Sequence, residues 1–115
     1  MLLTKKLQAG SLIFSEGSAD KSMYIVMEGS VKLSVTHHGM ELELAVIHKN
    51  EFFGEYEMFH NKPRSSSARA ITNVRLVHIK NRMQLDQFIG QYPAFSGKMV
   101  RMMGERLANT NASLL

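Results

Sequence analysis

The chain has 115 residues, 44% of them apolar, which is enough for one hydrophobic core but not for two. We therefore expect a single domain over residues 1–115. The formal charge of +4 would suit an anionic partner, but the basic residues are scattered, so direct nucleic acid binding is not indicated. The absence of cysteine excludes disulfides and thiolate chemistry and fits a reducing compartment. Because the N-terminus lacks a long apolar run, we expect a cytoplasmic protein with no signal peptide and no membrane span.

The first third of the chain predicts short strands separated by turns. Residues 1–9 are too short for a domain of their own and are interpreted as an entry segment. Leu12–Phe14 is the first predicted strand, and Met23–Met27, with β-branched and aromatic residues, is the second. Glycine, serine and aspartate in residues 15–21 predict a turn between them. Glu28-Gly29 is predicted to form a hairpin turn after the second strand.

Alternation of apolar and polar residues predicts a pair of antiparallel strands on either side of His38-Gly39. Both residues 31–36 and residues 41–46 alternate with period two, as half-buried strands do. Residues 71–79 resume strand character. Short strands with glycine turns predict a mainly β fold, a double-stranded β-helix or jelly roll over about residues 7–80, followed by C-terminal helices.

Two helices are predicted in the C-terminal part, over about residues 81–112. Asn81 can cap a helix that runs to Gly90, and Pro93 suits the first turn of a second helix. The second helix carries an apolar stripe with a period close to that of a helix, formed by Phe95, Met99, Met102, Met103 and Leu107. Two interpretations stay open. The stripe covers the core, or it moves or dimerises when a ligand binds.

The most informative stretch runs from Phe52 to Ala70. Gly54 lets the backbone turn after two bulky residues, and residues 55–59 suit one short helical turn that ends before Pro63. Arg64 then heads back along the next strand. Backbone N–H groups, the positive end of a helix and a guanidinium would converge there, which predicts a site for one phosphate.

The motif Phe53-Gly54-Glu55, followed after eight residues by Arg64-Ser65-Ser66-Ser67-Ala68-Arg69-Ala70, resembles the phosphate-binding cassette of cyclic nucleotide-binding domains. This family includes the bacterial catabolite activator, regulatory subunits of cyclic-nucleotide-dependent kinases and gated ion channels. Supporting motifs lie in residues 9–17 and 23–31, and the resemblance covers about residues 7–107. It implies a regulatory module with the jelly-roll fold that binds cyclic AMP or, less favoured, cyclic GMP, needs no cofactor and catalyses no reaction.

The resemblance also implies roles for individual residues. Arg64 matches the arginine that pairs with the cyclic phosphate, and Glu55 matches the glutamate that accepts the ribose 2′-hydroxyl hydrogen. Gly54 allows close backbone approach, and Ser65 touches phosphate or purine. The other expected ligand-binding residues are Phe53 and Leu44, which would wall the sugar, and Tyr56 and Ser66 within the motif. A residue of the second helix would cap the base, with Met102, Met103 and Arg106 as candidates.

Glu57 departs from the family pattern, which has Ala, Gly or Ser at this position because the backbone N–H lies against the phosphate. At ~6 Å and an effective dielectric constant of ~20, its repulsion with a bound phosphate would be about 3 kcal/mol. We expect Glu57 to point outward, to Lys62 or solvent, so that Glu57→Ala changes the affinity for cyclic AMP by less than about tenfold. An inward Glu57 would leave the pocket weak or empty.

Three alternatives accompany this interpretation. Glu55 and Arg64 could form a plain surface salt bridge. A module of the same fold could hold no nucleotide and serve in dimerisation or docking, with a second copy or an effector domain bound to the C-terminal helix. The third is a metal site, because the sequence holds five histidines. His37 and His38 are adjacent and would point to opposite faces of a strand, so no metal site is expected.

Overall fold

The computed structural model describes residues 3–98 of the chain. In chain order the elements are β1 (Leu3–Leu7), β2 (Leu12–Phe14), β3 (Met23–Glu28), β4 (Val31–His37), β5 (Met40–Ile47), β6 (Phe52–Phe53), α1 (Glu55–His60), β7 (Ser67–Ala70), β8 (Val74–Ile79) and α2 (Arg82–Gln91). Residues 93–98 are also helical. The chain divides into two compact units, Met1–Gln84 and Leu85–Leu115.

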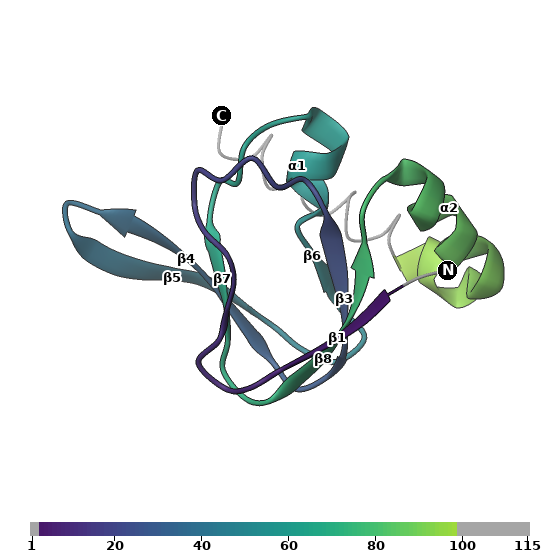
Figure 1. Ribbon diagram of the computed structural model, residues 1–115, viewed down its shortest axis with the longest axis horizontal. Coiled ribbons are helices and arrows are strands. Elements are labelled where there is room, and N and C mark those ends of the chain that lie inside the picture. The colour runs from purple at the N-terminus through teal and green to yellow at the C-terminus, as the bar shows by residue number, and fades with distance from the viewer. Residues whose placement is uncertain (1–2, 99–115) are drawn as a thin grey trace. The chain divides into compact units, whose positions relative to one another are not determined.

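The first unit is built from two antiparallel sheets of four strands each (Figure 1). One sheet has the strand order β1-β8-β3-β6 and the other has the order β2-β7-β4-β5. Most neighbours within a sheet come from distant parts of the chain: β1 pairs with β8, for example, where Leu3 lies opposite His78. The predicted mainly β two-sheet fold with C-terminal helices is therefore confirmed.

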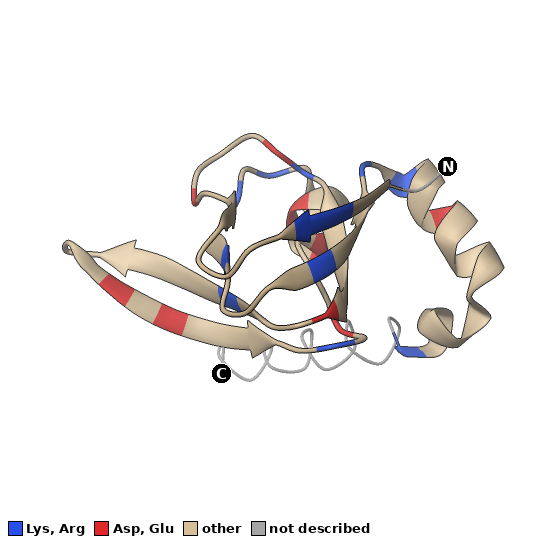
Figure 2. Cartoon of the chain, turned by 60° about the horizontal axis from the view of Figure 1, so that its bottom comes forward, with Lys and Arg blue, Asp and Glu red and all other residues tan. Residues whose placement is uncertain are grey.

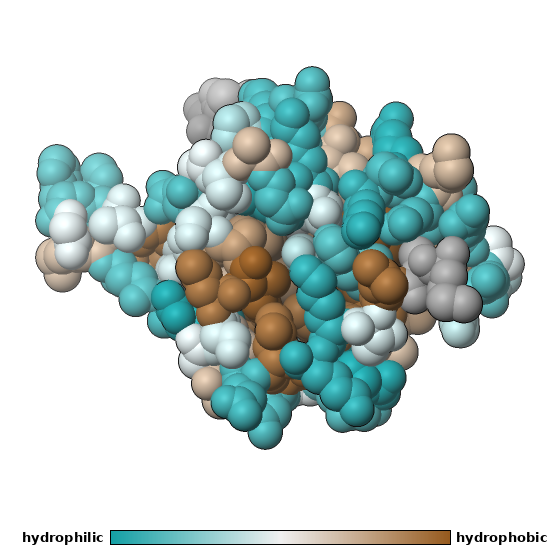
Figure 3. Space-filling view, in the orientation of Figure 1, coloured by the Kyte–Doolittle hydropathy of each residue, from teal (hydrophilic) through white to brown (hydrophobic). Residues whose placement is uncertain are grey.

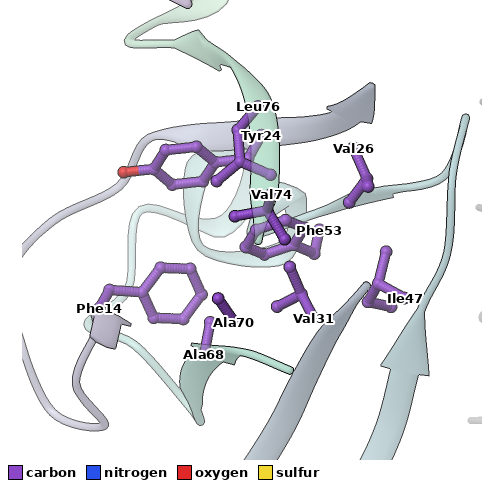
Figure 4. Close-up of a cluster of buried hydrophobic side chains, with 10 residues drawn as sticks. All are labelled: Phe14, Tyr24, Val26, Val31, Ile47, Phe53, Ala68, Ala70, Val74 and Leu76. Atoms are coloured by element: carbon purple, nitrogen blue, oxygen red, sulfur yellow. The ribbon is translucent and has the colours of Figure 1, made fainter. Parts of the chain in front are cut away.

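The hydrophobic core lies between the two sheets and draws side chains from both (Figure 4). Its buried members are Phe14, Tyr24, Val26, Val31, Ile47, Phe53, Ala68, Ala70, Val74 and Leu76. Three of their rings form one cluster, in which the Phe53 centroid lies 5.9 Å from that of Phe14 and 5.2 Å from that of Tyr24. Apolar residues also gather at the centre of the face shown in Figure 3, with polar residues around them. Because Phe53 directly precedes Gly54, the core anchors the start of the cassette.

The predicted hairpin across His38-Gly39 is confirmed. β4 and β5 pair from Val31 opposite Ile47 to His37 opposite Met40, with one register shift after Leu33. The tip of this hairpin projects from the sheets in Figure 1, and the first six residues of β5 are exposed. β5 carries acidic residues, drawn in red in Figure 2. Over the rest of the described chain, basic and acidic residues are interspersed.

The prediction of a hairpin at Glu28-Gly29 is wrong. β3 and β4 belong to different sheets, so this turn carries the chain from one sheet to the other. Gly29 has a φ of 87°, and a Cβ there would collide with the backbone oxygen of Asn73. The local residues favour a tight turn both in a hairpin and in a connection between sheets. The packing of this turn against the turn around Asn73 decides which sheet the next strand joins.

The boundaries of two predicted segments also differ in the structure. Residues 1–9 were expected to be an entry segment, but Leu3–Leu7 forms an edge strand, so the roll begins at Leu3 and not at about residue 7. The strand predicted over residues 71–79 begins only at Val74. The first four residues of β1 are exposed, and the strand contains two consecutive lysines, Lys5 and Lys6. Its sequence therefore lacks the alternation of apolar and polar residues that marks a half-buried strand.

The predicted cap of the first C-terminal helix is confirmed. The backbone N–H of Gln84 donates to Oδ1 of Asn81 over 3.0 Å, and the Gln84 side chain accepts from the N–H of Lys80 over 2.8 Å. Helical residues resume at Pro93, as its preference for the first turn predicts. The rest of the predicted second helix, from Met99 onward, lies outside the described residues. Within residues 3–98, no helix combines the length and the apolar character needed to cross a membrane.

Candidate functional site

The cassette, residues 52–70, folds as its sequence predicts at the level of the backbone. β6 ends at Phe53, Gly54 turns the chain with a φ of 84°, and α1 follows at once. The helix ends at His60 and is capped by Asn61, whose backbone is left-handed with a φ of 53°. Gly54 is needed for packing as well as for conformation, because a Cβ there would lie 2.8 Å from the Ser22 oxygen and 2.9 Å from Nη1 of Arg64.

Arg64 lies at the centre of this arrangement, and its side chain is fully buried. Nη1 donates to the backbone oxygen of Gly54 over 3.0 Å and to Oε1 of Glu57 over 3.4 Å. Nη2 donates to Oδ2 of Asp20 over 2.9 Å and to the backbone oxygen of Ser22. Four of the five guanidinium N–H donors are thus used, and Nε has no hydrogen-bond partner in the described part of the chain.

The backbone of Arg64 is fixed by the loop between β2 and β3. The N–H of Gly17 donates to the Arg64 oxygen over 2.8 Å, and the N–H of Arg64 donates to the Ser18 oxygen over 2.9 Å. The same loop reaches the end of α1, where Nζ of Lys21 donates to Oδ1 of Asn61 over 2.6 Å. The guanidinium carbon lies 3.9 Å from the centroid of the Phe14 ring. Arg64 is therefore held at both its backbone and its side chain.

The prediction that Glu57 points outward is wrong. Its side chain is 4% exposed, and its carboxylate faces Arg64 and not Lys62. The physical reason is the burial of Arg64. A buried guanidinium without counter-charges is costly, whereas an exposed Glu–Lys pair contributes little, so the carboxylate is better placed beside the arginine.

Burial and the charges at the site shift the pKa values of two further groups, Asp20 and Tyr24. Burial raises the pKa of Asp20, but hydrogen bonds from Arg64 and Ser22 more than offset it, so the pKa lies below its usual value. Burial, followed by the charge of Asp20, raises the pKa of Tyr24 to about 12. Asp20 is thus held in its charged form, and the Arg64 guanidinium already faces two carboxylates.

Of the remaining predicted site residues, three are buried and three are exposed. Phe53 is buried in the hydrophobic core, and Glu55 and Ser66 are buried within the cassette. Tyr56 is 45% exposed and packs on the ring of His60, with centroids 4.3 Å apart. Ser65 is exposed beside Arg64. Leu44, expected to wall the sugar, is 59% exposed on β5.

Sequence reasoning missed Asp20, Ser22 and Phe14 as partners of Arg64. Asp20 lies 44 residues before Arg64, in a stretch that the sequence marks only as a turn. The pairing of a turn aspartate with a distant arginine has no local signature. A concavity of about 510 Å³ on the first unit is lined by residues of β1, β3 and β8 and of the adjoining loops, among them Lys6, Glu28 and Arg75. It includes none of the residues around Arg64.

Comparison with known proteins places this chain in a family. The model of the cyclic nucleotide-binding domain matches residues 4–92. The chain is 36% identical to the CRP-like cAMP-activated global transcriptional regulator of Mycobacterium tuberculosis, over 97% of this chain and 52% of that protein. Among solved structures, the catabolite activator protein of Thermus thermophilus aligns with a TM-score of 0.81 at 27% identity, over 98% of this chain and 53% of that one. The cAMP-bound form of the EAL enzyme Bd1971 aligns with a TM-score of 0.69 at 28% identity, over 96% of this chain and 29% of that one.

These matches define the class of protein. The chain belongs to the cyclic nucleotide-binding domain family. It spans about half the length of the first of these curated relatives.

Proposed function

We propose that this chain is a regulatory module that binds a cyclic nucleotide, cyclic AMP in preference to cyclic GMP, at the cassette and signals through its C-terminal helices. In this proposal Arg64 pairs with the cyclic phosphate, Glu55 accepts a hydrogen bond from the ribose 2′-hydroxyl, and Gly54, Ser65 and Ser66 line the phosphate. Phe53, Leu44 and Tyr56 are the less central contacts. The module catalyses no reaction of its own, acts in the cytoplasm and transmits its state to a second copy or an effector domain.

The observation that carries the proposal is the buried Arg64 directly behind Gly54 in a member of this family. A guanidinium stays charged at any physiological pH, so it offers a permanent cation to a phosphodiester. We place cyclic AMP before cyclic GMP because of the nucleotides that are named for two of the relatives. The Mycobacterium tuberculosis relative is described as cAMP-activated, while the EAL enzyme is known in cAMP-bound and cGMP-bound forms.

Thermal denaturation with each cyclic nucleotide tests this function. A ligand that binds only the folded chain at 100 times its dissociation constant adds about 2.7 kcal/mol to the free energy of unfolding. We expect cyclic AMP to raise the melting temperature and Arg64→Lys to remove the rise, because lysine lacks the planar fork of donors. Equal shifts for the wild type and Arg64→Lys would contradict the assigned role of Arg64.

A second candidate function is a nucleotide-free module of the same fold that serves in dimerisation or docking. The inward Glu57 favours it, because the chain already supplies an anion to Arg64. Under this function neither cyclic nucleotide changes the melting temperature at any concentration. The same thermal experiment therefore separates the two candidates.

A further inference from the structure

The contacts of Arg64 leave no room for a phosphate without a rearrangement. Its side chain is 0% exposed, and only the Nε–H is not already donated to an acceptor among the described residues. An arginine binds a phosphate through charge-assisted N–H groups, most strongly through those at the tip of the guanidinium. One of the four present acceptors must therefore leave before an Nη–H group becomes available to a phosphate.

Of these four acceptors, Glu57 is the one most easily displaced. Two of the others are backbone oxygens, of Gly54 and Ser22, and cannot rotate away without moving the chain. The bond from Arg64 to Asp20 is 2.9 Å long, whereas that to Glu57 is 3.4 Å. The Glu57 carboxylate is carried by a flexible side chain on the six-residue helix α1. It can leave by rotation about its own side-chain bonds.

Arg64 cannot take the alternative course and swing out to meet a ligand. Its N–H and carbonyl oxygen are both bonded to the loop that carries Asp20, and its guanidinium lies on the Phe14 ring. A movement of Arg64 would break these contacts together. The rearrangement is therefore confined to Glu57 and the first turn of α1.

Charge leads to the same conclusion. Asp20 and Glu57 already outnumber the single positive charge of Arg64, and a cyclic phosphate would bring a third negative charge. Two unit charges ~6 Å apart at an effective dielectric constant of ~20 repel by an amount equivalent to a factor of roughly 100 in affinity. A phosphate and an inward Glu57 carboxylate are therefore poor neighbours.

We propose that the Glu57 carboxylate occupies the phosphate position on Arg64, and that a cyclic nucleotide binds only by displacing it. This inference rests on the proposed function, since it describes how the same site is regulated. Glu57 then acts as an internal competitor that raises the ligand concentration needed for a response. It replaces the expectation that Glu57→Ala has a small effect.

Calorimetric titration with cyclic AMP and cyclic GMP tests the inference on the wild type, Glu57→Ala, Glu57→Gln and Glu28→Ala. Glu57→Ala removes the competitor, and Glu57→Gln removes its charge at nearly constant size, which guards against a folding defect in the alanine variant. Glu28→Ala is the matched control, because Glu28 also pairs with an arginine, Arg75, but at the exposed surface. Circular dichroism establishes that each variant is folded.

We expect both Glu57 variants to bind cyclic AMP at least about tenfold more tightly than the wild type, with a gain near 100-fold for Glu57→Ala. Glu28→Ala should bind as the wild type does. Binding by the Glu57 variants and not by the wild type would show that Glu57 closes the site, and would favour the nucleotide-free function for the natural chain. Wild-type binding with a gain below about tenfold in the folded variants overturns the inference and leaves the proposed function intact. If neither the wild type nor any folded variant binds either nucleotide at ~1 mM, the proposed function itself fails.

Discussion

At the scale of single residues, the central feature is a guanidinium buried among acceptors. Arg64 is paired with Asp20 and Glu57 inside the first unit, whereas Arg75 is paired with Glu28 at its surface. Removal of one partner from a buried pair leaves uncompensated charge behind, while an exposed pair contributes little because water solvates both partners. The two arginines should therefore differ sharply in their effect on stability.

We predict that Arg64→Ala lowers the free energy of unfolding by about 3–5 kcal/mol, because Asp20 and Glu57 lose their cation. Arg75→Ala should lower it by less than about 1 kcal/mol. Urea denaturation of the two variants without added nucleotide measures both values. Similar losses for the two variants would show that the buried pairs do not stabilise the fold in this way.

The close approach at Gly54 supports a second prediction. Gly54→Ala places a Cβ in the left-handed region and within 2.8 Å of the Ser22 oxygen, whereas Gly10 has a similar φ of 87° with no atom within 4 Å of its Cβ position. Gly10→Ala should therefore lower the free energy of unfolding by about 1–2 kcal/mol, the cost of a left-handed backbone at a residue with a side chain. Gly54→Ala should lower it by at least ~1 kcal/mol more because of the steric clash. Chemical denaturation compares them, and equal losses would exclude the steric term.

At the scale of elements, the start of α2 depends on one side chain. Asn81 accepts from the Gln84 N–H, which otherwise has no partner within the first turn of a helix. We predict that Asn81→Ala lowers the free energy of unfolding by about 1 kcal/mol and that Asn81→Asp retains the cap. Urea denaturation monitored by circular dichroism at helix wavelengths gives the comparison. A loss as large in Asn81→Asp as in Asn81→Ala would mean that the cap is not the source of the effect.

At the scale of the whole molecule, a buried histidine makes stability depend on pH. His78 lies in the first sheet and stacks on Tyr24, with ring centroids 4.8 Å apart. Neither of its ring nitrogens has a hydrogen-bond partner within residues 3–98. Burial, followed by the charge of Lys5, lowers the pKa of His78 below its usual value of 6.5. The folded chain therefore holds this imidazole neutral where the unfolded chain would protonate it.

We predict that stability falls as the pH is lowered below about 6.5, because the unfolded state then binds a proton that the folded state does not. The loss grows until the pH reaches the lowered pKa of the folded state. His78→Phe keeps an aromatic ring against Tyr24 and removes the titration, so its melting temperature should fall less over the same pH range. Melting curves from about pH 7.5 to 5 measure this, and parallel decreases for both proteins would rule out His78 as the cause.

The organisation of the whole roll was predictable in part. Alternation identified β4 and β5 and their turn, and local residue types identified β2, β3 and the Asn81 cap. The edge strand β1 was missed because Leu3–Leu7 does not alternate, and the connection after β3 was mistaken for a hairpin. Whether residues 1–115 work as one domain, and what the apolar stripe of the second helix contacts, stay predictions.

The amino-acid sequence by itself determined the local course of the chain: which stretches are extended, where glycine and proline turn the chain, and how many residues separate Gly54 from Arg64. These properties depend on backbone preferences and on the period of apolar residues, both of which are local. Only the tertiary structure decided that Asp20 reaches Arg64 from 44 residues away and that Glu57 turns inward to join them. The reason is physical: the energy of a charged side chain depends on how far it is removed from water and on which charges the fold brings beside it, and neither quantity exists until distant segments have packed together.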